Sequence, residues 1–458
     1  MSATIIRKLK MLYHGKGRHK DRIIGFKHLM TELDDYQDDL SMIASAHHIY
    51  DTSKNENGYD NTLVVGDSNT GKTTGFVKPN ILNKQEDISY VVIDRDGSLK
   101  KETCELAREL GYRVEYMNPY DIENTQHYNP INNIYHYSDE YVKDIARSFC
   151  REFLKGEDTW WFRPAEMILS VILLYMKRNY SVRGHRPEDI LNYLIEMLET
   201  IKDESTDEVL PERFREYYNY AEKTGYREYV ELCKIMILDN SKEYLIPILQ
   251  MMINGFMILN SDTSKKLTDC DGVKVYKLFN FPTIVYIGFS KEDDTYNFLS
   301  RMLLEECIRE IDWRYENHGK KTLKHVRFML DDFLDLGVEK IFPEDSRIGR
   351  KPLDSLLSMA RFRNTSYQLC ARNIEQIIKA CGKMAQGILM CTDVLICTGT
   401  TNHMTAEYIS KNAGEIPDKN VDGLSKVPVV ARDILDMPED TEVILTRDQK
   451  AIFDKKYA

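Results

Sequence analysis

The clearest chemistry in this sequence comes from two glycines, a lysine and a threonine at fixed spacing. Gly66-Asp67-Ser68-Asn69-Thr70-Gly71-Lys72-Thr73 fits the pattern G-x-x-x-x-G-K-[ST], and Thr74 follows it directly. In this pattern backbone N–H groups curl around a triphosphate, the lysine reaches the β- and γ-phosphates, and the threonine hydroxyl binds Mg²⁺. These residues, Thr74 included, are therefore predicted to bind ATP together with Mg²⁺.

Two carboxylates after a second β-branched run are candidates for the metal and for the attacking water. Val326–Leu330 is followed directly by Asp331 and Asp332. We expect Asp331, with Thr73, to hold Mg²⁺ and Asp332 to polarise water. Acids at a strand end are otherwise mostly solvated loop residues, so this prediction depends on the phosphate loop. Asp94, after another run, is a weaker candidate near the same phosphates.

Short runs of β-branched residues, alternating with segments of helical period, would position these groups. One such helical segment is Leu99–Leu110, with Gly111 at its expected C-cap. The alternation predicts an α/β fold with a doubly wound, mainly parallel sheet. The predicted strands are Thr62–Val65, Tyr90–Ile93, Arg113–Met117, Thr283–Phe289, Val326–Leu330, Ser366–Cys370, Val394–Cys397 and Glu442–Leu445.

The strand pattern stops between about Arg151 and Asp271, where apolar residues recur at helical spacing. Ala165–Met176, Pro187–Met197 and Tyr229–Leu238 are the clearest helical segments. This pattern predicts an all-α domain inserted into the α/β domain. The expected organisation is a basic N-terminal segment (1–60), a first part of the nucleotide-binding domain (61–150), an all-α domain (151–275) and a second part of the nucleotide-binding domain (276–458).

The composition is that of a globular protein and limits the ligands to be considered. The 458 residues are 42% hydrophobic and 29% charged, with a net charge of −11, so a simple basic coat for nucleic acid is excluded. The nine cysteines have no C-x-x-C pair and are interpreted as packing residues of a reducing compartment. Because the histidines lack metal-ligand spacing, no metal other than nucleotide-bound Mg²⁺ is predicted.

The sequence has no window of about eighteen consecutive apolar residues, the length a membrane span needs. Basic residues between Arg7 and Arg22 replace the apolar stretch of a signal peptide. This segment is either a solvated basic tail or a contact for anionic lipid or DNA. The expected location is cytoplasmic, peripheral at the inner face of the cell membrane.

Several further segments, in order, give the chain a family resemblance. They are the Pro79-Asn80 ending of the phosphate-loop helix, YVVIDRDGSL (90–99), Tyr128-Asn129-Pro130, the entry into the helical domain (158–165), SKEDDTYNF (290–298), LDDFLDLG (330–337), ARFRNTS (360–366) and TTNHMTAEYISK (400–411). The chain from Asn61 onward resembles the type IV secretion coupling proteins, the TraG-type ATPases of conjugation.

The resemblance implies a RecA-like P-loop ATPase with an all-α domain, acting as a homo-oligomer of six subunits. It implies recruitment of relaxase-bound DNA, or a protein substrate, and its ATP-driven delivery to the channel components of a type IV secretion system. Arg361 and Arg363 match the segment in which a neighbouring subunit's arginine would reach the γ-phosphate. As ordinary arginines after a helical run, they would instead be surface residues.

The sequence departs from the family pattern at positions that bear on hydrolysis. The usual Asp-Glu pair is Asp331-Asp332, so the presumed base is one methylene shorter. Arg372 stands where a γ-phosphate-sensing glutamine is usual, and it either stabilises transition-state charge or pairs with an acid. Asp96 and Ser98 replace a lysine and a glutamate. The family's two N-terminal membrane spans are missing, so membrane contact is expected through a partner or the basic N-terminus.

Three functions follow from these observations. The first is an ATP-hydrolysing DNA translocase; the second is an ATP-binding adaptor with little turnover that recruits cargo for another ATPase. The third, a chromosome-partitioning or packaging motor, has poor support from the segments after Ser290. Trp160 and Trp161 are interpreted mainly as packing residues, with stacking on single-stranded DNA as the alternative.

Overall fold

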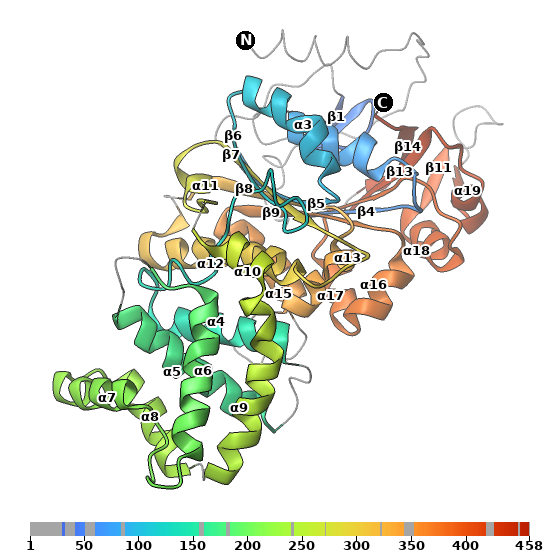
Figure 1. The fold of residues 1–458 in the computed structure, drawn as a ribbon. Helices are drawn as coiled ribbons and strands as arrows, with labels where there is room; N and C mark the ends of the chain where they lie inside the picture. Colours follow the sequence, from blue (N-terminus) through green and yellow to red (C-terminus); the bar gives the residue numbers. More distant parts are fainter. Residues whose placement is uncertain are drawn as a thin grey trace. The chain divides into compact units, whose positions relative to one another are not determined.

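The computed structural model describes residues 30–32, 42–50, 60–83, 88–154, 160–179, 184–239, 242–270, 272–320, 323–342, 352–417, 426–447 and 449–457. The chain divides into two compact units (Figure 1). The first unit is Met1–Val114, Tyr276–Tyr286 and His318–Ala458, and the second is Glu115–Val275 and Ile287–Asn317. The predicted basic stretch between Arg7 and Arg22 lies outside the described residues.

The largest sheet among the described residues has nine strands in the order β14-β13-β10-β4-β9-β8-β5-β7-β6. Strands β10, β4, β9, β8 and β5 pair in parallel, and β13 and β14 add an antiparallel edge. The strands are β4 (Thr62–Val65), β5 (Ile88–Arg95), β6 (Arg113–Met117), β7 (Thr283–Phe289), β8 (His325–Leu330), β9 (Thr365–Ala371), β10 (Val394–Cys397), β13 (Thr441–Thr446) and β14 (Gln449–Lys455).

The register of the parallel strands brings their carboxyl ends to one edge of the sheet. Val65 at the end of β4 pairs with Ala371 of β9 on one side and with Cys397 of β10 on the other. Leu330 at the end of β8 pairs with Leu369 of β9 and with Ile93 of β5. The residues that follow these strand ends therefore meet along a single line, which is where ligands bind in open α/β sheets.

Helices enclose this sheet, and β4, β7, β9 and β10 are buried along their whole length, as expected for parallel strands covered on both faces. The helical segments of the first unit are η3 (Lys72–Val77), α2 (Lys78–Leu82), α3 (Ser98–Glu109), α11 (Lys277–Asn280), α13 (Phe333–Leu336), α14 (Val338–Ile341), α15 (Leu353–Met359), η7 (Ala360–Arg363), α16 (Ile374–Cys381), α17 (Met384–Met390), α18 (His403–Ala413) and α19 (Ala431–Leu435).

The second unit is mainly helical, and a buried charged cluster stabilises its centre. Glu305 of α12 is paired with Arg151 of α4 at 2.9 Å and with Arg309 at 3.5 Å, and it accepts a hydrogen bond from Ser148. The helices are α4 (Asp139–Phe153), α5 (Phe162–Arg178), α6 (Pro187–Lys202), α7 (Glu212–Thr224), α8 (Arg227–Asp239), α9 (Lys242–Phe256), η4 (Met257–Asn260), α10 (Asp262–Thr268) and α12 (Asn297–His318).

Two small sheets complete the first unit, and neither was predicted from the sequence. The strands β1 (Met30–Glu32), β3 (His48–Tyr50) and β2 (Met42–Ile43) form one, and β11 (Glu415–Pro417) and β12 (Lys426–Pro428) form the other. Asn80, buried in α2, exchanges two hydrogen bonds with the backbone of Ile43, at 2.8 and 2.9 Å. The Pro-Asn ending of the phosphate-loop helix thus anchors the N-terminal sheet.

The structure confirms all eight predicted strands and the predicted helices Leu99–Leu110, Ala165–Met176, Pro187–Met197 and Tyr229–Leu238, each within a few residues. The second unit differs in extent from the predicted all-α range 151–275, because it begins at Glu115 and includes Ile287–Asn317. The interpretation of all nine cysteines as packing residues is wrong for Cys270, which is exposed, whereas the other eight are buried.

In the described part of the chain, no single helix has the length and apolar character to cross a membrane. One bent pair, Lys242–Asn260 with Asp262–Thr268, meets the length and composition criteria at an angle of 71°.

Candidate nucleotide-binding site

The phosphate loop connects β4 to η3 at the carboxyl edge of the sheet. Gly71 and Asn69 adopt left-handed backbone angles, with φ of 97° and 65°. A Cβ atom at Gly66 would stand 2.1 Å from Thr398 Oγ1 and 2.5 Å from Thr70 Oγ1, so only glycine fits there. The loop then enters η3 in π-type turns, a wide helical geometry that is frequent at functional sites.

Lys72 is folded into the loop that it is predicted to serve. Its ammonium donates to the carbonyl oxygens of Gly66 at 2.6 Å and Asp67 at 3.0 Å, and the side chain is buried. A phosphate oxygen offers an ammonium a charged acceptor in place of these neutral ones, and charge-assisted hydrogen bonds are roughly twice as strong. Lys72 is thus already at the position from which a P-loop lysine reaches the β- and γ-phosphates.

Residues after β10 support the loop from the other side. Asp67 accepts hydrogen bonds from the backbone N–H and the hydroxyl of Thr401, both at 2.7 Å. The hydroxyls of Thr70 and Thr398 are 2.7 Å apart. Thr398 was not singled out from the sequence, and Thr401 was named only as part of the family-like segment 400–411. The in-register pairing of β10 with β4 explains why both lie beside the loop.

Asp331 lies directly against the phosphate loop. Its Oδ2 accepts a hydrogen bond from the Thr73 hydroxyl at 2.7 Å. Burial raises the pKa of Asp331 to about 6, and Asp332 acts in the same direction, whereas the Thr73 hydroxyl and Lys72 oppose the shift. The structure therefore brings together the hydroxyl and the carboxylate that the sequence predicts as Mg²⁺ ligands.

Asp332 holds a strained backbone conformation immediately after β8. Its φ of 48° and ψ of 45° are left-handed, and its backbone carbonyl accepts from the N–H of Asp335 at 2.8 Å. Aspartate tolerates this region better than most residues, but the conformation costs on the order of 1 kcal/mol or more. Strain of this kind often marks a functional position, which fits the water-polarising role predicted for Asp332.

Asp94 has a structural task that the sequence did not reveal. Its two carboxylate oxygens accept hydrogen bonds from the backbone N–H groups of Leu99 at 2.9 Å and Lys100 at 2.8 Å, which cap α3. Burial raises the pKa of Asp94 to about 6, and the nearby charge of Asp331 adds to this shift. The carboxylate is thus already used in holding the helix N-terminus.

Arg372 follows β9 at the same edge of the sheet, one residue beyond the partner of Val65. Its guanidinium donates to Asp335 at 3.2 Å, and Arg95 lies 3.9 Å from the same carboxylate oxygen. Of the two alternatives for Arg372, the structure displays the ion pair with an acid. The guanidinium remains one third exposed, so this surface pairing contributes little stability.

Arg361 and Arg363 lie at the opposite end of β9 from the phosphate loop. They belong to η7, which precedes the strand, and the seven residues of β9 span roughly 20 Å. Neither arginine therefore approaches the phosphate loop of its own chain. Arg363 is buried, whereas Arg361 is partly exposed beside the exposed ring of Phe362.

The last residues of the chain also approach the loop. A Cβ atom on Gly71 would lie 3.6 Å from Cδ of Lys456, and one on Gly75 would lie 3.0 Å from the carbonyl oxygen of Tyr457. Burial lowers the pKa of Lys456. A lysine near the phosphate loop adds positive charge to the site, and the sequence offered no signal for it because it follows a strand that was not predicted.

Oxygen donors at the strand edge suit a magnesium ion. Mg²⁺ prefers oxygen ligands, and it is usually held by one or two protein groups together with waters and phosphates. Besides Oδ2, which accepts from Thr73, Asp331 has a buried Oδ1 with no nitrogen or oxygen donor among the described residues, and the thiol of Cys370, a weak donor, lies beside the carboxylate. A buried carboxylate with so few donors beside the P-loop threonine fits a cation with its water shell.

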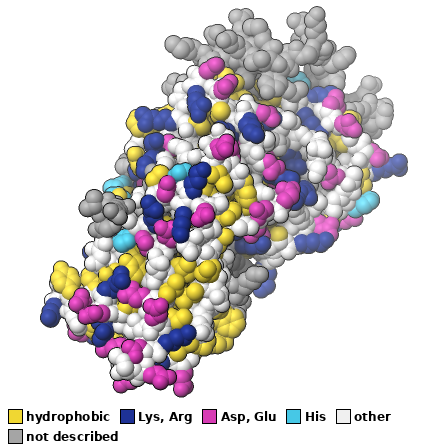
Figure 2. All heavy atoms as spheres, viewed as in Figure 1, with side chains coloured by type: hydrophobic (Ala, Val, Ile, Leu, Met, Phe, Trp, Pro, Cys, Tyr) yellow, Lys and Arg dark blue, Asp and Glu magenta, His cyan; other side chains and the backbone are white. Residues whose placement is uncertain are grey.

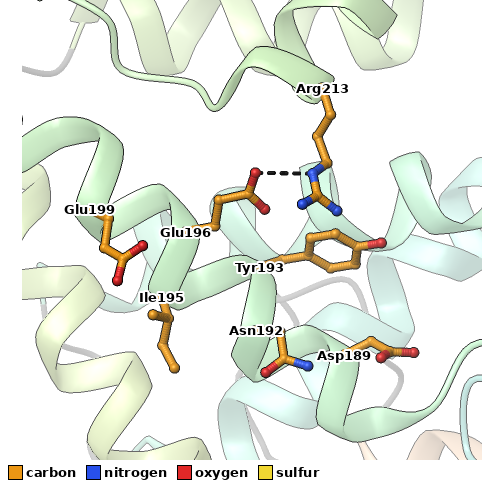
Figure 3. Close-up of a pocket in the computed structure, with 7 residues that line it drawn as sticks. All are labelled: Asp189, Asn192, Tyr193, Ile195, Glu196, Glu199 and Arg213. Carbon is orange, nitrogen blue, oxygen red and sulfur yellow. Dashed lines mark hydrogen bonds and ion pairs between the residues drawn. The ribbon is translucent and has the colours of Figure 1, made fainter.

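A separate pocket of about 340 Å³ lies within the second unit (Figure 3). Arg213 of α7 pairs with Glu196 of α6 at 3.0 Å, and its guanidinium lies over the ring of Tyr193. The other lining residues come from α6: Asp189, Asn192, Ile195 and Glu199. Because its carboxylates outnumber its single cation, this pocket does not suit a triphosphate.

Trp160 and Trp161 belong to the second unit. Trp160 is 59% exposed, with its ring 5.6 Å from that of Trp161 and 5.2 Å from that of Tyr244. The sequence-based interpretation of Trp160 as mainly a packing residue therefore does not fit its exposed ring.

Comparison with known proteins decides the family. The family model described as "Type IV secretory system Conjugative DNA transfer" matches residues 41–426, which include the phosphate loop, Asp331 and the arginine segment. This chain belongs to that conjugative DNA transfer family. The resemblance seen in the sequence is thereby confirmed. A search of curated protein sequences finds no significant match.

Several solved structures share the fold of this chain over most of its length. The plasmid coupling protein TrwB in complex with the ATP analogue ADPNP has a TM-score of 0.59 and 14% identity, over 96% of this chain and 95% of that chain. TrwB in complex with ADP and Mg²⁺ gives 0.57 and 15%, over 88% and 86%. VirB4 of Thermoanaerobacter pseudethanolicus gives 0.50 and 12%, over 92% and 97%. The predicted RecA-like fold with a helical domain is confirmed.

Proposed function

We propose that this member of the conjugative DNA transfer family hydrolyses ATP and uses the energy to move DNA toward a type IV secretion channel. The observation that most supports hydrolysis is the 2.7 Å hydrogen bond between Thr73 and Asp331. It joins the phosphate loop to the end of a strand two places away in the sheet, β4 and β8 being separated only by β9. A nucleotide site that also holds Mg²⁺ needs this pairing.

The chain's own residues divide the work at this edge of the sheet. Lys72 and the backbone N–H groups of the loop hold the phosphates, and Thr73 and Asp331 hold the metal. When bound, Mg²⁺ neutralises charge on the β- and γ-phosphate oxygens. Asp332, whose left-handed backbone sets it at the strand exit, orients a water for attack and accepts its proton. Related structures of TrwB with ADPNP and with ADP and Mg²⁺ support ATP and Mg²⁺ as the ligands.

The negative charge that develops on the phosphates in the transition state needs a nearby cation. The arginines of η7, Arg361 and Arg363, do not reach the phosphate loop of their own chain. Because Arg361 is partly exposed and lies at the far end of β9, it is suited to reach the nucleotide of an adjacent subunit. Arg363 is buried and is better suited to fixing η7 in place. This division requires a homo-oligomeric ring, and we propose six subunits on the basis of the family resemblance.

The charge of the molecule limits how it contacts DNA. Figure 2 shows Lys and Arg interspersed with Asp and Glu on the face in view, and the net charge of the chain is −11. Non-specific DNA binding depends on local cations that neutralise phosphates. DNA is therefore proposed to contact a local lining of the ring. The remaining proposed partners are a relaxase and channel components, met at the inner face of the membrane, with membrane contact through a partner or the basic N-terminus.

A triplex-displacement assay tests the motor directly. The intact protein is incubated with ATP, Mg²⁺ and a duplex that bears a labelled triplex-forming strand, and release of that strand is followed. A translocase releases the strand in an ATP-dependent manner, and Lys72→Ala abolishes release. Lys101→Ala, on the exposed face of α3, is the matched lysine control and leaves the rate unchanged. Release independent of ATP, or none under any condition, contradicts the motor.

The alternative is an ATP-binding adaptor with little turnover, and two observations favour it. Asp332 is one methylene shorter than the glutamate usual in coupling proteins, and Arg372 is engaged with Asp335 in place of a γ-phosphate sensor. The adaptor binds ATP tightly, hydrolyses it at the Lys72→Ala background rate, and releases no strand in the displacement assay. The motor and the adaptor therefore differ in the rates of ATP hydrolysis and of strand release, compared at equal occupancy of the site by ATP.

A further inference from the structure

Three side chains of different chemistry converge in the second unit, and none of them belongs to the nucleotide site. His127 Nδ1 lies 2.5 Å from Asp269 Oδ1 and 3.5 Å from Cys270 Sγ. The imidazole nitrogen, the thiol sulfur and a carboxylate oxygen all lie within 4.8 Å of one another. Asp269 and Cys270 are neighbours in the sequence, but His127 is more than 140 positions away from both, so the fold brings it to them.

The backbone holds the two segments in register. The carbonyl of His127 accepts hydrogen bonds from the N–H groups of Gly272 at 2.8 Å and Val273 at 3.1 Å, and the N–H of Tyr128 donates to Leu267 at 2.8 Å. A Cβ atom on Gly272 would stand only 3.1 Å from both the nitrogen and the oxygen of His127, so glycine permits this close approach. The cluster is therefore attached to a preformed backbone.

The exposure and charge of the three groups suit a cation. Cys270 is the exposed cysteine of the chain, and the Asp269 side chain is 43% exposed, so ions and water reach both. Partial burial acts to raise the pKa of Asp269, but hydrogen bonds from His127 and Cys270 and the nearby Arg186 hold it below its usual value. The Asp269 carboxylate is thus ionised at neutral pH and can bind a cation without first losing a proton.

The donor set distinguishes between metals. Nitrogen, sulfur and carboxylate oxygen together are typical of Zn²⁺, whereas Mg²⁺ and Ca²⁺ prefer oxygen alone. In a tetrahedral zinc site neighbouring donors lie about 3.3–3.6 Å apart. The imidazole-to-sulfur distance of 3.5 Å already agrees, and the exposed carboxylate has to move outward by less than about 1 Å.

We propose that His127, Asp269 and Cys270 form a Zn²⁺ site, with water as the fourth ligand. The ion replaces the thiol proton of Cys270, which passes to solvent, and it takes the place of the proton on Nδ1 of His127, whose neutral ring then carries its one proton on Nε2. The net charge of the three ligands with the metal becomes zero. The site ties the segment after β6 to the exit of α10 and stabilises this part of the second unit. It departs from the sequence-based expectation that no metal other than Mg²⁺ binds the chain.

The test uses the full chain, stripped of metal with a chelator and assayed without nucleotide. Zn²⁺ affinity is measured by competition with a chromophoric indicator, and Co²⁺ is added as a spectroscopic probe. The wild type is expected to bind one Zn²⁺ tightly and to show a thiolate-to-cobalt charge-transfer absorption. Cys270→Ser and His127→Gln are expected to weaken binding by about 100-fold or more, because changes in outer-shell groups alone cost 10- to 100-fold.

Two further variants keep the outcome interpretable. Asp269→Asn retains shape but weakens the site, and His136→Gln, an exposed histidine in the same unit, leaves affinity unchanged. Circular dichroism of each metal-free variant confirms that it is folded. Zn²⁺ binding of equal strength in Cys270→Ser, a cobalt spectrum without the thiolate band, or no binding by the wild type would overturn the proposal.

Discussion

At the scale of single residues, the site depends on short side chains held in unusual positions. Asp331 is close enough to Thr73 to share a metal, and Asp332 occupies a left-handed conformation one residue later. The backbone angles at Asp332 set the direction in which its side chain leaves the chain, and the length of that side chain sets how far the carboxylate reaches toward water. In the proposed mechanism, the acid that holds the metal and the acid that orients water are therefore consecutive residues at the end of β8.

Replacing Asp332 tests the second of these roles without disturbing the backbone. Asparagine tolerates the left-handed region as well as aspartate does, so Asp332→Asn is expected to fold normally. Loss of a general base lowers kcat by about 10²–10⁴-fold, with ATP affinity unchanged. Asp60→Asn is the matched control, since Asp60 also has a positive φ, of 62°, and precedes β4 at the end of that strand away from the phosphate loop. A kcat equal to wild type in Asp332→Asn would show that another group activates the water.

The raised pKa of Asp331 predicts a pH dependence of metal-nucleotide binding. Burial raises this pKa from 3.8 to about 6 in the folded protein, so the carboxylate is increasingly protonated as the pH falls below 6. Mg²⁺ needs the ionised form, and Mg·ATP affinity is expected to fall about tenfold per pH unit below about 6 and to level off above it. In Asp331→Asn, affinity should be weak and should keep only the pH dependence of the nucleotide's own terminal phosphate, whose last pKa is about 6. Isothermal titration calorimetry measures both, and identical pH profiles would contradict the assignment.

At the scale of elements, the sequence predicted what depends on local pattern. Buried parallel strands are rich in β-branched residues, so eight strands of the large sheet, and the helices between most of them, could be predicted from the sequence. The strand β14, with the sequence QKAIFDK, was missed because it has only three consecutive apolar residues, with polar and charged residues on both sides of them. The role of Thr401 in supporting the phosphate loop was missed because its partner, Asp67, is 334 positions away in the sequence. The capping role of Asp94 depends on backbone N–H groups only five and six residues later, but its place at a strand end also fitted a contact with phosphates.

The antiparallel edge of the sheet contains a buried carboxyl group, that of Glu442, whose ionisation lowers the free energy of unfolding. Burial raises the pKa of Glu442 in β13 to about 8, the charge of Asp454 adds to this shift, and Lys456 opposes it. Because the folded pKa exceeds the unfolded value of 4.5, stability is lost as the pH rises from about 4.5 to about 8. Glu442→Gln removes this loss and is expected to increase the free energy of unfolding by about 1–3 kcal/mol at pH 8.5.

Denaturant unfolding at two pH values checks the sign of this effect. The stabilisation by Glu442→Gln should be present at pH 8.5 and absent at pH 4, where the wild-type carboxyl is protonated in both states. Glu439→Gln, at an exposed position before β13, serves as the control and should change stability by less than about 0.5 kcal/mol. A destabilised Glu442→Gln at pH 8.5 would mean that the carboxylate is paired and ionised.

At the scale of the whole molecule, the proposed mechanism needs more than one chain. Arg361 and the phosphate loop stand at opposite ends of β9, so a complete site requires subunits that present opposite edges to each other. The exposed apolar side chains of the helical unit, such as Tyr220, Ile235 and Met257, are further surfaces that an assembly would cover. The sequence alone could not give this geometry, because it contains no information on which edges meet.

Subunit mixing tests whether Arg361 acts between chains. Lys72→Ala and Arg361→Ala should each reduce ATP turnover by at least about 10³-fold, because an arginine supplied in trans is worth 10³–10⁵ in kcat. An equimolar mixture should recover part of the activity, since some interfaces pair an intact phosphate loop with an intact arginine. Arg363→Ala, at a buried position, should instead lower stability. If mixing restores no ATP turnover, Arg361 acts on the nucleotide of its own chain, and the proposed role between subunits is contradicted.

The central claim, that this member of the conjugative DNA transfer family is an ATP-hydrolysing motor, is tested most directly by steady-state ATP turnover. The intact protein, Lys72→Ala and Asp332→Asn are compared with no DNA, with single-stranded DNA and with double-stranded DNA. The motor predicts turnover that DNA accelerates and that both substitutions abolish. ATP binding with turnover at the Lys72→Ala background under all three conditions would contradict the motor and leave the adaptor as the function of the chain.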